Sequence, residues 1–211
     1  MADAKTLEEL AHPEYWNNRY QKGADGGTFE WFKSFKNLEG FFTQYLPKPS
    51  NEGRSPQILH LGCGNSELPI DLHSIGYRNQ VCVDFSEVVI NDMGTRNAER
   101  DGIDWKVADV RDLKDINDAS MDVAIDKGTL DAMLSGSLWD PPEPVRKNTT
   151  AYIDQVVRVL KPGGVFIYIT YRQPHFMKPM VARDGKWDLK VITLNEDAGT
   201  FDYFAFVMTK H

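Results

Sequence analysis

From residue 57 onward, short apolar runs alternate with longer stretches in which apolar positions recur at helical spacing. The apolar runs predict seven strands: Gln57–Leu61, Gln80–Asp84, Asp104–Ala108, Met121–Asp126, Val165–Thr170, Trp187–Leu194 and Tyr203–Thr209. Helices predicted at Glu67–Ile75, Ser86–Arg100 and Thr149–Leu160 separate the earlier strands, and strands separated by helices form parallel βαβ units. The last two strands have little helix between them, which predicts an antiparallel edge.

The first fifty residues follow a different pattern, because aromatic side chains occupy most of their apolar positions. Helices are predicted at His12–Gln21 and Trp31–Tyr45. The segment Pro47–Pro56 (PKPSNEGRSP) has the composition of a linker. We therefore expect two parts: a helical, aromatic lid over residues 1–50 and an α/β domain over residues 51–211.

The segment Ile58–Glu67 (ILHLGCGNSE) predicts a strand, a glycine turn and the start of a helix. Gly62 and Gly64 let the backbone turn sharply and approach a ligand without a β-carbon in the way. The free N–H groups at the start of the helix point toward such a ligand. A lone G-x-G pattern is equally typical of a tight turn without a ligand, so the interpretation needs support from other positions.

Acidic residues at the ends of the next two strands supply that support. Asp84 lies twenty residues after Gly64, the spacing at which an acid binds a ribose diol. Asp109 follows the third strand, where a carboxylate accepts a hydrogen bond from an adenine amino group. Either acid alone is typical of a solvated loop. Ligands bind at the carboxyl ends of parallel strands, however, so the combination predicts a nucleoside site.

Glu67 helps to distinguish between nucleoside cofactors. A dinucleotide site needs a third small residue at this place so that the helix can close on a pyrophosphate, which a carboxylate would repel. S-adenosylmethionine has no phosphate and carries a sulfonium cation, which aromatic ring faces attract. Trp16, Tyr20 and Trp31 are candidates for that contact, with packing in the core as the alternative role.

Five segments together resemble the class I S-adenosylmethionine-dependent methyltransferases: LHLGCGNSELPIDL, VCVDFSEVVI, WKVADVRDL, MDVAIDKGTLDAML and VLKPGGVFIYIT. The opening PEYWNNRYQ…FEWF and the pair LGCGNS and DKGTLDA are similar to a narrower group. That group is the eukaryotic lysine methyltransferases of translation elongation factor one alpha. The resemblance covers roughly residues 12–180, and within it LKPGG alone is widespread.

The resemblance implies a Rossmann-like α/β fold: a seven-stranded, mostly parallel sheet with an antiparallel last strand and helices on both faces. It implies S-adenosylmethionine as cofactor and S-adenosylhomocysteine as product. The matching positions are Gly62 and Gly64 at the methionine moiety, Asp84 and Phe85 at the ribose and adenine, Asp109 and Val110 at the adenine edge, and Lys127, Trp16, Tyr20 and Trp31 as further cofactor contacts.

The substrate side of the site is marked less clearly. Many amine methyltransferases place an Asn-Pro-Pro-Tyr motif after the fourth strand, where this chain has Asp126-Lys-Gly-Thr-Leu-Asp131. We expect Asp126 to position the substrate amine. Asp131 is the alternative, although an acid at a helix start also pairs with the helix dipole. The loops 135–147 (SGSLWDPPEPVRK) and 171–180 (YRQPHFMKPM) are candidates to face the substrate.

The composition limits the classes of molecule that could be a substrate or partner. The formal net charge of −7 disfavours a nucleic-acid substrate and suits a basic protein or a neutral small molecule. No apolar run is long enough to cross a membrane and the N-terminus lacks a secretion pattern, so we expect a cytoplasmic protein, and we expect it to be a monomer. Cys63 and Cys82 are interpreted as buried thiols, and the histidines lack metal-ligand spacing, so no metal is expected.

The leading hypothesis is therefore a protein-lysine methyltransferase that acts on a partner such as translation elongation factor one alpha. Three alternatives stay open at this point. They are a methyltransferase for a small metabolite, an NAD-type oxidoreductase, which Glu67 disfavours, and a non-catalytic adaptor with the same fold. The intact Gly62, Gly64, Asp84 and Asp109 argue against a decayed site.

Overall fold

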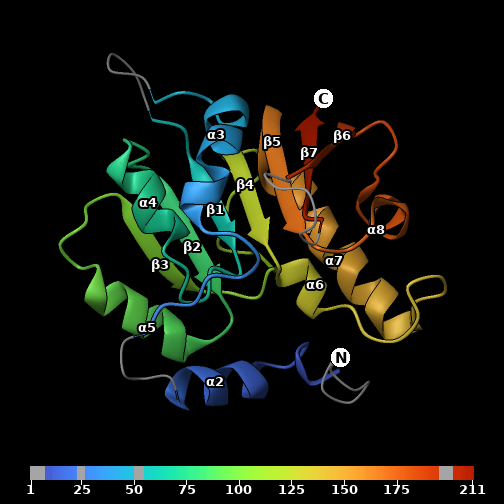
Figure 1. Ribbon diagram of the computed structural model, residues 1–211, viewed down its shortest axis with the longest axis horizontal. Coiled ribbons are helices and arrows are strands. Elements are labelled where there is room, and N and C mark those ends of the chain that lie inside the picture. The colour runs from blue at the N-terminus through green and yellow to red at the C-terminus, as the bar shows by residue number, and fades with distance from the viewer. Residues whose placement is uncertain (1–7, 23–26, 50–54, 195–201) are drawn as a thin grey trace.

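A computed structural model of the protein describes residues 8–22, 27–49, 55–194 and 202–211. Its centre is a seven-stranded sheet with the strand order β3-β2-β1-β4-β5-β7-β6 (Figure 1). The strands are β1 Ile58–Leu61, β2 Gln80–Asp84, β3 Ile103–Val107, β4 Met121–Lys127, β5 Leu160–Thr170, β6 Trp187–Thr193 and β7 Phe204–Lys210. The Rossmann-like sheet expected from the sequence is confirmed, including its antiparallel last strand.

Strands β1 to β5 are parallel, and β7 lies antiparallel between β5 and β6. The chain builds outward from β1 to β3 and then crosses back to place β4 on the other side of β1. The strand order thus reverses between β1 and β4, and sheets of this kind bind ligands at the carboxyl ends of the strands beside such a reversal. The glycine turn follows β1 directly, so the topology brings it to that crevice.

Helices cover both faces of the sheet, and the alternation of side chains along each strand decides which helix they meet. Leu59 and Leu61 of β1 share a core cluster with Tyr152. Ile58 instead shares a cluster with Phe42 on the other face. Burial on both faces explains the nearly continuous apolar sequence of the central strands. The helices are α2 Pro13–Lys22, α3 Phe35–Tyr45, α4 Leu68–Ser74, α5 Glu87–Arg96, α6 Thr129–Ala132, α7 Glu143–Val159 and α8 Pro174–Val181.

The N-terminal segment that we expected to form a lid contains two helices with different surroundings. Helix α3 packs into the core, where Leu38 and Phe42 are almost completely buried. Helix α2 has no buried residue and contacts α5. It lies below the carboxyl ends of the parallel strands in Figure 1, at the opposite end of the sheet from α3. Helix α2 and the segment after it, rather than α3, are therefore placed over the crevice.

Helix α3 begins later than the predicted Trp31. Its first residue is Phe35, because Phe32 has a φ of 65°, a left-handed conformation that a right-handed helix does not contain. The turn places the ring of Phe32 between those of Tyr171 and Tyr203, with centroid distances of 5.5 and 5.7 Å. The contact of Phe32 with two rings that are distant in the sequence therefore prevents the helix from starting at Trp31, where the local pattern predicts it.

The region around α7 also differs from the prediction. The helix expected from Thr149 begins at Glu143, so the loop predicted over residues 135–147 is partly helical. Pro144 is compatible with this start because proline is tolerated in the first turn of a helix. Strand β5 begins at Leu160 rather than at the predicted Val165, so the segment Lys161–Gly164 lies within the strand.

Two short helices have no clear signal in the sequence. Helix α6 has four residues, which is too short for a hydrophobic period to develop. Helix α8 lies in the predicted loop 171–180, begins at Pro174 and contains Pro179, and proline normally argues against a helix. The helix forms nevertheless because Met177 and Val181 are completely buried in the core.

The same substitution at two depths tests the core. Val123 of β4 is completely buried, whereas Val107 of β3 is half exposed. We expect Val123→Ala to lower the free energy of unfolding by about 2 kcal/mol, because it removes two buried methyl groups and leaves a cavity. Val107→Ala is the control, with an expected change below about 0.5 kcal/mol in urea unfolding followed by circular dichroism. Equal losses for both variants would contradict this description of the core.

Candidate active site

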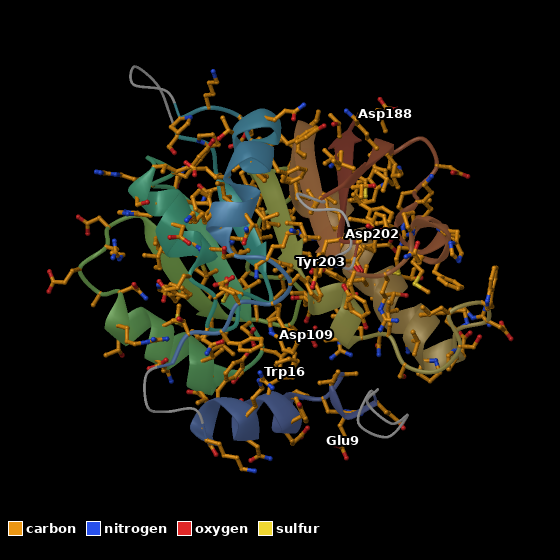
Figure 2. All side chains as sticks on the ribbon, viewed as in Figure 1. Glu9, Trp16, Asp109, Asp188, Asp202 and Tyr203 are labelled. Atoms are coloured by element: carbon orange, nitrogen blue, oxygen red, sulfur yellow. The ribbon has the colours of Figure 1, made fainter. Side chains whose placement is uncertain are left out.

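A pocket lies at the carboxyl ends of β1, β2 and β4, beneath the segment that precedes α3. Figure 2 shows Trp16 and Asp109 in the space between the sheet and α2, and both side chains line the pocket. Its wall includes every predicted cofactor residue except Val110: Trp16, Tyr20, Trp31, Gly62, Gly64, Asp84, Phe85, Asp109 and Lys127.

The glycine turn after β1 contains two residues in the left-handed region. Gly62 and Gly64 have φ values of 64° and 51°. A Cβ on Gly62 would collide with the side chain of Thr129, and a Cβ on Gly64 would lie 2.8 Å from the hydroxyl oxygen of Tyr20. The Thr129 hydroxyl also donates a 2.7 Å hydrogen bond to the carbonyl oxygen of Leu61, which joins the turn to α6. A larger side chain at either glycine would therefore disturb this side of the pocket.

Asp84 stands at the end of β2, and the backbone fixes its carboxylate. The N–H groups of Gly64 and Ser86 donate hydrogen bonds to it over 3.0 and 2.9 Å. Burial raises the pKa of Asp84 to about 6, although these backbone hydrogen bonds oppose the rise. Above that pH the ionised carboxylate can accept hydrogen bonds from a diol in the pocket.

Asp109, after β3, pairs with Arg111. The Arg111 Nη2 atom lies 2.6 Å from Asp109 Oδ2, and Arg111 Nε donates to both carboxylate oxygens. Burial disfavours the ionised carboxylate, but the hydrogen bonds and charge of Arg111 outweigh it and lower the pKa of Asp109. An adenine amino group would share this carboxylate with Arg111. The Val110 side chain points into the core, with 2% exposure, so the structure does not bring it to the pocket.

Aromatic rings form the roof of the pocket. The ring centroid of Trp16 lies 5.8 Å from that of Tyr20 and 6.1 Å from that of Trp31. The indole N–H of Trp16 donates to the carbonyl oxygen of Leu10 over 2.7 Å, which fixes its orientation. Burial, helped by the neighbouring Asp84 carboxylate, raises the pKa of Tyr20, so its hydroxyl stays protonated. The rings themselves are uncharged and attract a cation, and the guanidinium of Arg19 already lies 5.2 Å from the Trp31 ring centroid.

Glu30 fastens this roof to the sheet through residues 27–33, which we call the strap. Glu30 Oε2 accepts a 2.8 Å hydrogen bond from Lys127 Nζ at the end of β4. Glu30 Oε1 accepts from the Ser66 hydroxyl over 2.9 Å and from the backbone N–H of Glu67. Burial lowers the pKa of Lys127, while the Glu30 carboxylate opposes that shift and keeps the ion pair charged. One carboxylate therefore ties the strap to both loops that border the crevice.

Glu30 also bears on the choice of cofactor. Its carboxylate accepts the N–H group at the start of α4, where a dinucleotide-binding turn holds a pyrophosphate. Glu30 and Glu67 together would repel phosphate groups from this position. The structure thus strengthens the argument against a dinucleotide that the sequence makes from Glu67 alone.

Asp126, which we expected to position the substrate amine, does not line the pocket. It is completely buried, and its carboxylate accepts hydrogen bonds from the N–H groups of Thr129 and Leu130 over 2.8 and 2.9 Å. The hydroxyl of Tyr152 donates a third bond of 2.7 Å. Burial raises the pKa of Asp126 to about 7. The expectation from the sequence misplaces this side chain, because α6 folds over it and uses it to hold its first turn.

Asp131, the alternative, does line the pocket. The hydroxyls of Tyr168 and Thr170 donate hydrogen bonds to its carboxylate over 2.8 and 2.7 Å. Arg172 Nε lies 3.2 Å from the same group. Burial raises the pKa of Asp131, and these three partners oppose the rise. The wall of the pocket toward β5 therefore carries a fixed carboxylate with a cation beside it.

Sequence reasoning overlooks Glu30, Arg111 and Thr129. Glu30 has a usable signal, since it is an acid inside the aromatic run FEWF. Arg111 follows an acid already assigned to the adenine, at a distance of two residues. Thr129 has no local signal, because its contact with the turn after β1 arises only when β4 pairs with β1.

Other expectations concern loops, thiols, metals and membranes. Tyr171 and Arg172 of the loop 171–180 line the pocket, whereas no described residue of 135–147 does so. Cys82 is buried, and Cys63 is partly buried in the pocket wall. In the part of the chain that the structure describes, no three His, Cys, Asp or Glu side chains gather around a possible metal ion. Nor does any helix within those ranges have the length and apolar content needed to cross a membrane.

The crevice suits a nucleoside that carries a cation and has no phosphate. Asp84 and Asp109 provide acceptors for a ribose and an adenine. Gly62 and Gly64 line the pocket without side chains, so an amino-acid tail can approach the backbone there, and the rings of Trp16 and Trp31 attract a cation. S-adenosylmethionine has all of these parts, so the residues present fit it. Together with the strand order, this pocket defines a class I S-adenosylmethionine-dependent methyltransferase.

Comparisons with known proteins agree. A family model described as a methyltransferase domain matches residues 54–200. The mouse protein EEF1A lysine methyltransferase 4 is 37% identical over 204 residues, which make up 93% of this chain and 74% of the mouse protein. The bovine eEF1A lysine and N-terminal methyltransferase is 33% identical over 219 residues. That match covers 98% of this chain but 30% of the bovine protein.

A solved structure shows the same fold. It is the Burkholderia thailandensis 1,6-didemethyltoxoflavin-N1-methyltransferase with bound S-adenosylhomocysteine, with a TM-score of 0.62 and 12% identity. The superposition covers 100% of this chain and 91% of that chain. The chain belongs to the methyltransferase domain family, within the group that includes the EEF1A lysine methyltransferases.

Replacing Glu30 with glutamine is expected to loosen the strap. The substitution removes the charge that faces the buried Lys127 ammonium, so we expect the free energy of unfolding to fall by about 2 kcal/mol. Glu143→Gln is the matched control, because Glu143 is 87% exposed and lies 4.0 Å from Arg146; its expected effect is below about 0.5 kcal/mol. Urea unfolding compares the two. If Glu30→Gln were as stable as Glu143→Gln, this ion pair would not hold the strap.

The affinity for S-adenosylhomocysteine is expected to fall as the pH drops through about 6, because Asp84 then gains a proton and loses its role as a ribose acceptor. The stability of the fold depends on pH in the opposite direction to the affinity. The folded-state pKa of Asp84 lies above its unfolded value, so its contribution to stability is largest at low pH and is lost as the pH rises through about 6. Isothermal titration across this range measures the affinity.

Two variants separate Asp84 from other acids in this titration. Asp84→Asn should bind weakly with little dependence on pH. Asp109→Asn should also bind weakly but keep the pH dependence, because the pKa of Asp109 is lowered and does not fall in this range. A wild-type affinity that stays constant across pH 6 would contradict the assignment of Asp84 as the ribose acceptor.

Proposed function

We propose that this protein transfers a methyl group from S-adenosylmethionine to a lysine side chain of translation elongation factor one alpha. The observation that carries the proposal is the 37% identity to the mouse EEF1A lysine methyltransferase 4, which extends over 93% of this chain. The match includes the N-terminal segment as well as the α/β domain, so it covers both the roof and the floor of the pocket.

Different residues of the pocket would contact different parts of the cofactor. When bound, S-adenosylmethionine supplies a methyl group activated by a positively charged sulfur. Gly62 and Gly64 would line its methionine part, while Asp84 would bind the ribose hydroxyls. The remaining contacts would be Phe85 beside the adenine, Asp109 at the adenine amino group, Lys127 near the tail, and Trp16, Tyr20 and Trp31 around the sulfonium; Val110 would support Asp109 from the core.

The N-terminal segment acts as a lid on this site. We assign the lid to residues 1–50 and the catalytic domain to 51–211, with α2 and the strap as the parts that cover the cofactor. The strap is fastened by polar contacts of Glu30 and by the partly buried ring of Phe32, whereas α3 is anchored by fully buried side chains. Opening therefore requires the strap and α2 to move while α3 keeps its place.

Methyl transfer to an amine needs a neutral nitrogen held in line with the methyl group, with water excluded. The aromatic roof of Trp16, Tyr20 and Trp31 excludes water and lowers the local polarity. In such surroundings a lysine amine loses its proton more readily than in solution. The protein thus contributes alignment and a dry surface.

The charge of the protein supports a protein substrate. A net charge of −7 favours a basic partner and disfavours a nucleic acid. We propose that the enzyme works as a monomer on a folded protein. An elongation factor as substrate also implies that the enzyme is located in the cytoplasm.

The test is transfer of radiolabelled methyl groups from S-adenosylmethionine to purified elongation factor one alpha, followed by mapping of the labelled residue. We expect label on a lysine, and we expect Asp84→Ala to reduce the rate at least about 100-fold because the ribose loses its acceptor. The same assay on a cell extract is the wider control. Label that appears only in small molecules would reject the elongation factor in favour of a metabolite.

A further inference from the structure

We infer that Asp131 binds the ammonium group of the target lysine and that Arg172 occupies this place until the substrate arrives. The inference rests on the proposed methylation of a lysine and adds the residues that receive it. It concerns the wall of the pocket toward β5, to which no part of the cofactor is assigned.

The carboxylate of Asp131 is fixed in advance. Tyr168 donates to Oδ2 over 2.8 Å and Thr170 donates to Oδ1 over 2.7 Å, both from β5. The residue is 7% exposed and lines the pocket. An ionised carboxylate can accept about four hydrogen bonds. The two hydroxyls therefore leave capacity for a cation that approaches from the pocket.

Arg172 neutralises this carboxylate without being locked to it. Its Nε lies 3.2 Å from Asp131 Oδ1 but makes no hydrogen bond, and its Nη2 reaches the backbone carbonyls of Asp131 and Leu134 only at 3.4 Å. The Arg111–Asp109 pair in the same pocket shows the strong alternative, with Nε and Nη2 both bonded and a shortest distance of 2.6 Å. Arg172 is thus held mainly by charge.

In its position beside Asp131, Arg172 also contacts an aromatic ring at the edge of the pocket. Its guanidinium lies 5.4 Å from the ring centroid of Tyr171, which lines the pocket and is 47% exposed. A guanidinium over an aromatic ring keeps a favourable contact while it is exposed to water. Arg172 can therefore keep this contact with Tyr171 while it gives up its place beside Asp131 to another cation.

The replacement of Arg172 by a substrate group favours a group that carries a positive charge. A buried carboxylate that loses its cation is strongly destabilising, so Arg172 can leave only if an incoming group replaces its charge. A lysine ammonium does so, whereas a neutral acceptor such as a hydroxyl does not. Once bound, the ammonium can give a proton to Asp131: an N–H bond breaks, an O–H bond forms, and the neutral amine keeps its lone pair. Burial raises the pKa of Asp131, which favours this transfer.

A small-molecule titration tests the exchange directly. The probe is n-butylammonium, a mimic of the lysine side chain, added to the protein loaded with S-adenosylhomocysteine and followed by tryptophan fluorescence. Arg172→Met should bind the probe about tenfold more tightly than the wild type, because the probe no longer displaces a cation. Asp131→Asn should bind it roughly 10- to 100-fold more weakly than Arg172→Met.

Two controls distinguish an effect of charge on probe binding from an effect of packing. The neutral probe 1-butanol should bind the wild type and Arg172→Met equally. Asp154→Asn removes an ion-pair partner of Arg183, and neither residue lines the pocket, so this variant should bind n-butylammonium as the wild type does. If Arg172→Met bound n-butylammonium no better than the wild type, the exchange would be disproved. That result decides the question even if Asp131→Asn fails to fold. The wild type provides a test that needs neither variant: it should bind n-butylammonium more tightly than 1-butanol, and equal affinities would also disprove the exchange.

Kinetics on the protein substrate complete the test. Asp131→Asn should lower kcat/KM for elongation factor one alpha roughly 10- to 100-fold while the affinity for S-adenosylhomocysteine changes less than about twofold. Full activity in this variant would refute the role of Asp131. A wild-type enzyme that does not methylate the elongation factor, but shows the expected butylammonium titrations, would refute the proposed substrate and leave the role of Asp131 intact.

Discussion

The Glu30 carboxylate is the contact on which the architecture of the site depends. It joins the strap to the start of α4 through Ser66 and Glu67 and to the end of β4 through Lys127. Helix α2 contributes no fully buried residue, although its partly buried Tyr20 packs against the buried side chains of α5. The roof of the pocket is therefore held by polar bonds together with partly buried rings such as Phe32, whereas the sheet beneath it is held by fully buried apolar packing. The roof can open while the fully buried core of the sheet stays intact.

The sheet and the cofactor side of the pocket could be predicted because their signals lie close to strand ends. Gly62, Gly64 and Asp84 each end or follow a strand, and the topology of parallel sheets brings such positions together. The substrate side could not be predicted in this way. Whether Asp126 or Asp131 faces the pocket depends on the turn after β4 and on partners from α7 and β5, which lie more than twenty residues away. No local pattern records those partners.

The acids of the pocket show how one residue type acquires different properties. Asp84 is buried among backbone donors, and its pKa rises to about 6. Asp109 accepts hydrogen bonds from both Nε and Nη2 of Arg111, and its pKa falls. Asp131 meets hydroxyls and a loosely held arginine, and its pKa rises. The cation beside each carboxylate, or the lack of a firm one, thus sets whether the group is permanently ionised or able to exchange protons.

The position of β7 has a consequence for how the chain assembles. Strand β6 precedes β7 in the sequence, yet its pairing partner in the described sheet is β7, which in turn pairs with β5. During synthesis β6 therefore emerges before the strand with which it pairs. The edge of β5 must stay free for β7, which is translated later, so the order of the strands in the sheet on this side of the protein reverses the order of translation.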